Sequence, residues 1–220
     1  MQIVGPHLSE RGRPMCDYQT SKTYRVRQAP KRASYDRALV HSILDEGYVA
    51  HIAFVTDGLP VALPMFYVRD GDSVLLHGSR KSRLMKHLAD GAPLCLTVTH
   101  LDGLVLARSA FHHSMNYRSV MVHGRAERVT GDEKARTMAL ITARVREGRP
   151  SGERPVNEQE AKATEMLRLP LVEVAAKVRV GGPLDDEADM TLPVWAGVIP
   201  MRLVFGEPVR DGASVSVAVA

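Results

Sequence analysis

The dipeptide Asp57-Gly58 is the sequence feature that most restricts the fold of this chain. It separates two runs of apolar and β-branched residues, at 48–56 and 59–69. A two-residue Asp-Gly connection between such runs is typical of a tight β-hairpin, because both central residues must adopt positive φ. Another tight turn and a third apolar run follow at once, at residues 70–77. The sequence therefore predicts a protein built mainly from antiparallel strands.

Alternation and cap signals place the remaining elements. The further strands are expected at residues 94–99, 104–109, 118–129, 172–180 and 193–205, the first two paired around a turn at His100–Gly103. The helices are expected at residues 34–46 with Ser34 as N-cap, at 131–147, and from Asn157 to a point before Pro170. A further short helix is expected within residues 75–91, with Ser79 or Ser82 as its cap and Gly91 as its stop. Short strands joined by tight turns, with few helices between them, favour an antiparallel barrel or sandwich over a parallel sheet.

The length and charge distribution suggest one domain with short extensions. The 220 residues carry a net charge of +4, and the first 32 residues hold seven basic against two acidic side chains. The excess positive charge therefore belongs to the N-terminal segment and not to the body. We expect a flexible basic arm over residues 1–23, a single domain over 24–206, and a loose tail over 207–220.

Composition excludes several classes of function. No apolar run approaches the length of a membrane span or resembles a signal peptide, so we expect a cytoplasmic protein. Only 5% of the residues are aromatic, which argues against a stacking surface for nucleic acid. His112 and His113 could join His77 or His123 around a metal, but no cysteine or carboxylate lies at ligand spacing, so no metal site is expected. Nucleophile elbows and Walker loops are missing as well.

The segment LLHGSRKSRLMKHLADG, residues 75–91, predicts a strand that turns into a short helix with a basic first turn. Arg80, Lys81 and Arg83 crowd this turn, and Ser79 and Ser82 add hydroxyl groups. Cations and hydroxyls in such a turn are suited to a phosphate. The alternative is a solvated helix start that happens to be basic.

The segment SAFHHSMNYRSVMVHG, residues 109–124, is dense in hydrogen-bonding side chains for the start of a strand. Ser114, Asn116, Tyr117 and Ser119 could bind a polar heterocycle. The alternative is a loop whose polar groups satisfy their own backbone, as is common in turns.

The order of these segments resembles that of the flavin-mononucleotide-binding split barrels, which include pyridoxamine 5′-phosphate oxidases and nitroimidazole-resistance (Nim-type) reductases. The oxidases have a GSRK turn before a helix, as at residues 78–81, and a strand of the type R-Q-V-x-x-x-G-x-A-x-R, similar to residues 118–128. The pieces PMFY at 64–67 and HSMNYRSV at 113–120 resemble the Nim-type branch more closely. The likeness extends over about residues 24–205.

This resemblance implies an FMN cofactor and a set of residues to hold it. The phosphate would lie on Gly78, Ser79, Arg80, Lys81, Ser82 and Arg83. The isoalloxazine ring would lie close to His77 and against a strand whose backbone amides can bond the ring edge, formed by Pro64, Met65, Phe66 and Tyr67. Ser114, Tyr117 and Ser119 would complete its pocket. Members of the family are homodimers with the cofactor at the interface, so Lys177 and Trp195 would reach the partner's site.

The resemblance also implies an activity. The C-terminal motif that follows Trp195 in the oxidases lacks its His and second Arg here, and Ser119 replaces their glutamine. We therefore expect an FMN-dependent oxidoreductase that passes electrons from a nicotinamide nucleotide or another small donor to a small acceptor, and not a pyridoxamine phosphate oxidase. His77 and His113 are the candidate proton carriers, because histidine titrates near neutral pH. The alternative is a non-catalytic carrier of the same fold that binds a flavin, a deazaflavin or haem.

Overall fold

The computed structural model describes residues 17–146, 152–209 and 211–212. Its strands are β1 Ala33–Ser34, β2 Val49–Thr56, β3 Leu59–Asp70, β4 Ser73–Ser79, β5 Pro93–Leu106, β6 Ser114–Arg125, β7 Glu127–Arg128, β8 Thr164–Pro170, β9 Glu173–Arg179 and β10 Gly197–Pro200. Its helices are α1 Arg37–Glu46, α2 Arg83–Ala89, α3 Gly131–Arg146 and α4 Glu158–Ala163, with short 3-10 turns at Pro30–Arg32, Ala110–His112 and Glu187–Asp189.

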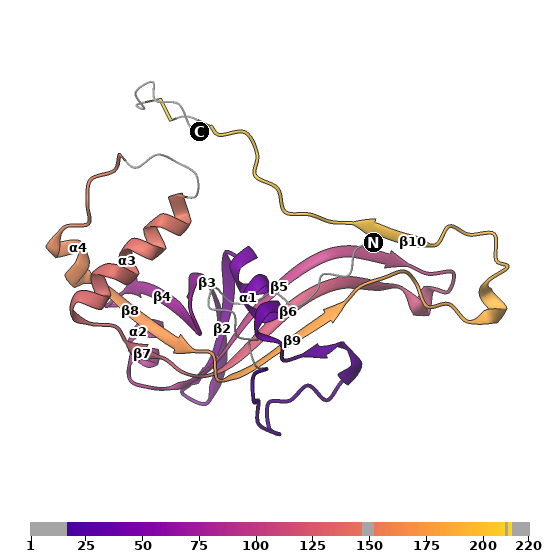
Figure 1. Cartoon of the computed structure of the whole chain (residues 1–220), viewed down its shortest axis with the longest axis horizontal. Coiled ribbons are helices and arrows are strands. Elements are labelled where there is room, and N and C mark those ends of the chain that lie inside the picture. Colours follow the sequence, from indigo (N-terminus) through magenta and orange to yellow (C-terminus); the bar gives the residue numbers. More distant parts are fainter. Residues whose placement is uncertain (1–16, 147–151, 210, 213–220) are drawn as a thin grey trace, which may run out of the picture.

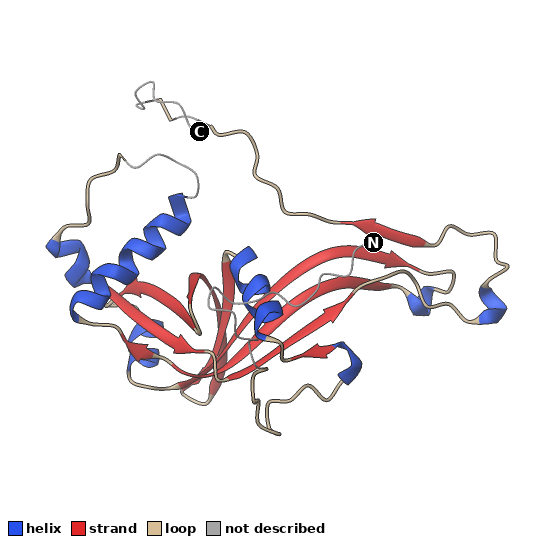
Figure 2. Ribbon diagram, in the orientation of Figure 1, coloured by secondary structure: helices blue, strands red, loops and turns tan. Residues whose placement is uncertain are grey.

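The strands form one antiparallel sheet that curls into a barrel (Figure 1). Their order is β1-β9-β6-β5-β2-β3-β4-β8-β7, and β10 pairs with β5 beside this path. β7 follows β6 directly in the chain and pairs with β8. The β8 end of the strand order is therefore connected back to β6, which closes the barrel. α3 and α4 lie at one end of the molecule, and α1 lies near its middle (Figures 1 and 2). The expected antiparallel barrel with few helices is confirmed.

The β2–β3 hairpin forms as expected. Asp57 and Gly58 have φ of 52° and 75°, the positive values that a tight two-residue connection requires. The ladder runs without interruption from Thr56–Leu59 to Val49–Phe66. This long register fixes which side chains of β2 and β3 share a face of the sheet.

The expected turn at residues 100–103 is wrong, because this stretch lies inside the single strand β5. Asp102 and Gly103 form a bulge in the ladder with β6 instead of a turn. The Asp102 carboxylate accepts hydrogen bonds from Arg118 of β6 at 2.8 and 2.9 Å. A Cβ at Gly103 would lie 2.8 Å from the Ile199 carbonyl oxygen, so the glycine lets β10 approach β5 closely.

Other boundaries also differ from the expectation. α1 begins at Arg37, and its N-cap is Asp36, whose carboxylate accepts from the Leu39 amide at 2.7 Å. Ser34, the expected cap, belongs to β1. The capping box at Asn157 forms, but α4 is short and the chain enters β8 at Thr164. The final strand, expected over 193–205, is limited to β10.

Three helices cover different faces of the sheet. α1 and α2 close the barrel interior, where Ile43, Leu44, Met85 and Leu88 are almost fully buried. α3 covers the outer face of β3 and β8, where Ile141 packs with a second apolar cluster. In the described part of the chain, no helix covers the outer face of β2, β5 and β6 (Figures 1 and 2).

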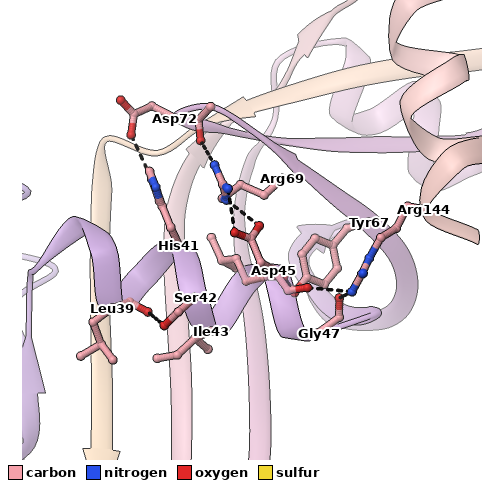
Figure 3. A network of polar contacts seen from close by, with 12 residues as sticks. Leu39, His41, Ser42, Ile43, Asp45, Gly47, Tyr67, Arg69, Asp72 and Arg144 are labelled. Atoms are coloured by element: carbon pink, nitrogen blue, oxygen red, sulfur yellow. Dashed lines mark hydrogen bonds and ion pairs between the residues drawn. The ribbon is translucent and has the colours of Figure 1, made fainter. Parts of the chain in front are cut away.

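A network of polar contacts fixes α1 against the sheet and against α3 (Figure 3). Arg69 of β3 binds both oxygens of Asp45 at 2.7 Å, and the buried Tyr67 hydroxyl donates to the Leu44 carbonyl at 2.6 Å. Arg144 of α3 donates to the Asp45 carbonyl at 2.7 Å. The end of α1 is therefore held by side chains from two other elements.

The expected extensions are described only in part. Residues 1–16 and 213–220 lie outside the described residues. Within the expected arm, Tyr18 and Thr20 are buried; the Tyr18 hydroxyl donates to Asp72 at 2.9 Å. Within the tail, residues 207–209 are exposed. Among the described helices, none is long and apolar enough to cross a bilayer.

Candidate functional site

The basic turn joins β4 to α2, at the end of the barrel where α4 leads into β8. The Ser82 hydroxyl caps α2 by accepting from the Met85 amide at 3.5 Å, and the Ser79 hydroxyl accepts from the Lys81 amide at 3.2 Å. Gly78 serves packing, because a Cβ there would lie 2.8 Å from Met85 Cγ. Ser79, Ser82 and Gly78 therefore have structural roles in forming the turn.

The cations of this turn are in different states. The Arg80 amide donates to the Ala163 carbonyl at 2.9 Å, and its guanidinium lies 3.5 Å from Glu165. Lys81 and Arg83 are exposed, and among the described residues neither forms an ion pair. Two free cations, and a third that is neutralised, form a weaker cradle than the sequence suggested, but one that still suits a phosphate.

Beside this turn the barrel is split. β3 pairs with β4 only over Tyr67–Asp70, and in the described structure no strand pairs with the same edge of β3 before Tyr67. Pro64, Met65 and Phe66 therefore lie along an edge whose backbone groups can bind a ligand. Tyr67 cannot line that space with its ring, because its side chain is 1% exposed and bonded to Leu44. The burial of this side chain leaves open the expected contact, which is through the backbone amides of the strand.

His77 lies where β3 and β4 diverge. Its ring packs edge-on against Phe66, with 6.4 Å between centroids, and burial lowers the pKa of His77. The Nδ1 atom is buried and has no hydrogen-bond partner among the residues that the structure describes. A buried polar atom without a partner costs free energy, so this nitrogen is suited to meet a polar atom of a ligand.

The other residues expected around the ring lie elsewhere in the subunit. Ser119 is on β6 and its hydroxyl donates to the Lys177 carbonyl of β9 at 3.3 Å. β2 and β5 separate β6 from β3, so this cluster is roughly 14 Å from Phe66 at the usual strand spacing. Ser114 and Tyr117 lie further along β6. One subunit therefore does not bring these residues to the basic turn.

Trp195 and His113 lie at the far end of the molecule, where β10 pairs with β5 (Figure 1). Trp195 is 64% exposed and packs against Gly197. The His113 ring accepts a hydrogen bond from the Ala107 amide at 2.9 Å, which assigns it a role in the loop. Neither residue is close to the split.

The outer face of the sheet is a candidate functional surface that none of the sequence motifs indicated, although strand alternation would have. Along β2 this face carries Val49, His51 and Val55, all exposed, and across β5 it continues to Met121 and His123 of β6. His123 stacks on Tyr24 with 4.3 Å between centroids, and its Nε2 lies 3.9 Å from Cys95 Sγ. A hollow of about 460 Å³ opens there between Tyr24, Val55, Ala62, Cys95 and His123.

Fold and site together define the class of this protein: an antiparallel split barrel with a basic turn beside the split. A sequence model of the pyridoxamine 5′-phosphate oxidase family matches residues 36–178. The chain therefore belongs to the pyridoxamine 5′-phosphate oxidase family of split barrels, which confirms the resemblance seen in the sequence.

Solved structures agree with this assignment. The flavocytochrome Anf3 from Azotobacter vinelandii is 40% identical with a TM-score of 0.81, over 89% of this chain and 92% of that one. A FAD- and haem-binding protein from Mycobacterium smegmatis is 35% identical with a TM-score of 0.81, over 84% and 91%. A proposed 5-nitroimidazole antibiotic resistance protein from Bacteroides thetaiotaomicron shares the fold at 18% identity and a TM-score of 0.55, over 66% and 86%. No curated protein matches the chain.

Proposed function

We propose that this protein binds a flavin at the split between β3 and β4 and passes electrons through it. The observation that carries the proposal is the combination of an open strand edge, the unpartnered Nδ1 of His77, and the free cations Lys81 and Arg83, all next to one another in the fold. The similarity to a flavocytochrome and to a FAD- and haem-binding protein supports it.

The residues at the split have distinct parts in this proposal. Lys81 and Arg83 neutralise the flavin phosphate, and Phe66 presents an apolar surface to the ring. A bound flavin supplies reversible one- and two-electron transfer, and the protein orients it and adjusts its electronics. His77 is held neutral by its lowered pKa, so its Nδ1 accepts or donates one hydrogen bond according to tautomer. The sequence resemblance implies FMN, whereas one similar structure binds FAD; the phosphate contact is common to both.

We further propose that the protein is a homodimer. The outer face of β2, β5 and β6 exposes Val49, Val55 and Met121 at 50%, 60% and 41%. An apolar sheet face of this kind, without a covering helix, is typical of an interface. A second copy on this face would also bring its own Ser119 and Lys177 near the split, where one subunit lacks them.

Haem binding is a second candidate function, favoured by the outer face. His51 projects from β2 among exposed apolar residues, and His123 lies two strands away on β6. Imidazole on an apolar surface is the usual axial ligand of a b-type haem. The absorption spectrum therefore distinguishes a simple flavoprotein from a flavocytochrome, because only the flavocytochrome has a haem band.

The first experiment is the absorption spectrum of the purified protein before and after anaerobic NADH and NADPH. Flavin bands that bleach on reduction support an electron-transfer flavoprotein, and bands that persist support a carrier. An added Soret band that is lost in His51→Ala or His123→Ala supports haem and identifies the ligand. A colourless protein that takes up neither FMN nor FAD contradicts the proposal.

A double variant tests the position of the flavin phosphate. Lys81→Ala with Arg83→Ala should weaken flavin binding by tens- to a thousandfold, because each charge-assisted hydrogen bond contributes about 1.5–3 kcal/mol. The control is Lys22→Ala with Arg27→Ala, which removes the same charge from exposed residues of the N-terminal segment. Equal flavin affinity in the two double variants would show that the flavin phosphate is not bound at this turn.

A further inference from the structure

A groove runs between α3 and the segment that precedes and includes α4. Its volume is about 550 Å³. The apolar lining consists of Ala135, Met138, Ala139, Ala143, Pro155 and Val156. Thr142 and Lys134 add polar groups. A mostly apolar cavity of this size with a few polar atoms is typical of a small-molecule site.

The charges at the rim of this groove are balanced internally. Arg146 lies 3.1 Å from Glu153, and Arg154 donates to both oxygens of Glu160, one at 3.0 Å. The remaining cation of the lining, Lys134, donates to the carbonyls of Ala161 and Thr164, so the charged side chains of the groove are already engaged with the protein. The groove is suited to a neutral, flat group and not to a phosphate.

The groove and the basic turn lie on opposite sides of the C-terminal end of α4. On one side, Arg80 donates from its backbone to Ala163 at 2.9 Å and lies 3.4 Å from the Lys162 carbonyl. On the other side, Lys134 of α3 donates to the carbonyls of Ala161 and Thr164, both at 2.7 Å. One helical turn of α4 therefore separates the cations of the turn from the groove.

We propose that this groove binds the adenosine half of FAD, an inference that rests on flavin binding at the split. The pyrophosphate would lie over Lys81, Arg83 and the exposed Lys162, while the uncharged adenosine enters the apolar groove. In this arrangement the anionic pyrophosphate of FAD lies on the cations and the neutral adenosine lies in the groove. FMN lacks the adenosine and uses the turn alone.

The test compares FAD and FMN binding to the flavin-free protein and to two variants of α3. Ala139→Trp fills the groove. Val145→Trp is the control, because Val145 is 66% exposed on the same helix and does not line the groove. We expect the unaltered protein to bind FAD about tenfold or more tighter than FMN. Ala139→Trp should lower FAD affinity to that of FMN and leave FMN affinity unchanged, and Val145→Trp should change neither.

Retained FMN affinity also shows that each variant is folded. Equal affinities for FAD and FMN in the unaltered protein would overturn the adenosine site while leaving flavin binding intact. A preference for FAD that survives Ala139→Trp would overturn it equally. If the unaltered protein binds neither flavin, the proposed function fails, and the adenosine site fails with it.

Discussion

Tyr67 shows how one hydroxyl can connect two elements of the barrel. Its ring is buried between β3 and α1, and its hydroxyl donates to the last-turn carbonyl of Leu44. Burial raises the pKa of Tyr67, so the hydroxyl keeps its proton and remains a donor. Gly47 lies directly over it, since a Cβ there would be 2.4 Å from the hydroxyl oxygen.

Tyr67→Phe should lower the free energy of unfolding by about 1–3 kcal/mol, because the Leu44 carbonyl would be left buried and unpaired. Flavin affinity should not change, since this side chain does not face the split. Urea unfolding and a flavin titration on the same variant measure the two effects. A large loss of flavin affinity at unchanged stability would contradict this prediction and show that the Tyr67 side chain contacts the flavin.

Arg118 joins three elements through two carboxylates, Glu46 at the end of α1 and Asp102 in the bulge of β5. The hydrogen bond from Arg118 outweighs desolvation and lowers the pKa of Glu46. A carboxyl whose pKa is lower in the folded state stabilises the fold above its ordinary value of 4.5, and this contribution is lost as pH falls through the folded value.

Glu46→Gln should therefore be less stable than the unaltered protein at pH 7, and the difference should shrink as pH falls below the ordinary carboxyl value of 4.5. Urea unfolding of both proteins at several pH values between 3 and 7 measures this difference. Because the two proteins differ only at position 46, the difference reports on this side chain and its pairing with Arg118. A difference that stays constant with pH would show that the pair does not depend on the ionised carboxylate.

At the scale of elements, β10 depends on one residue of its neighbour. Gly103 is where the backbone of β10 comes closest to β5, and the pairing extends over only four residues of each strand. Such a short edge strand has little else in the described structure to hold it. Access of the Ile199 backbone to β5 therefore decides whether this strand forms.

Gly103→Ala should detach β10, because the added methyl group would meet the Ile199 oxygen at 2.8 Å. Amide hydrogen exchange in residues 197–200 should become faster, while exchange in β2 and β3 stays as before. Gly182→Ala is the matched control, since a Cβ there meets no atom within 4 Å. Unchanged protection of β10 would show that the strands can separate slightly without losing their pairing.

At the scale of the molecule, the exposed outer face should govern assembly. Val55→Asp with Met121→Asp places two carboxylates on that face and should weaken dimerisation at least tenfold, because each buried apolar side chain contributes about 1.5–3 kcal/mol. Light scattering across a dilution series measures the mass. Val145→Asp, on the exposed side of α3, is the control and should not change it. A monomer at all concentrations in the unaltered protein would contradict the dimer.

The sequence by itself determined the features that depend on near neighbours. The hairpin at Asp57-Gly58 and the capping box at Asn157 each follow from two to four adjacent residues, and both form. For α2 the sequence offered Ser79 or Ser82 as the cap, and Ser82 is the residue that caps it. The number and tightness of such turns indicated an antiparallel barrel or sandwich, and the resemblance to the split barrels favoured the barrel. Local hydrogen bonding and allowed φ values leave few alternatives at these points.

Only the tertiary structure decided the features that depend on partners distant in sequence. Asp102 and Gly103 have the composition of a turn, but Arg118 and the backbone of β10 make them a bulge within β5. Tyr67 belongs to a motif for ring binding, yet the packing of α1 buries it. The basic residues of the turn look equivalent in sequence, but Glu165 of β8 neutralises Arg80 and leaves Lys81 and Arg83 free. Contacts between residues that are distant in sequence form only when the chain folds, so a local sequence pattern does not indicate them.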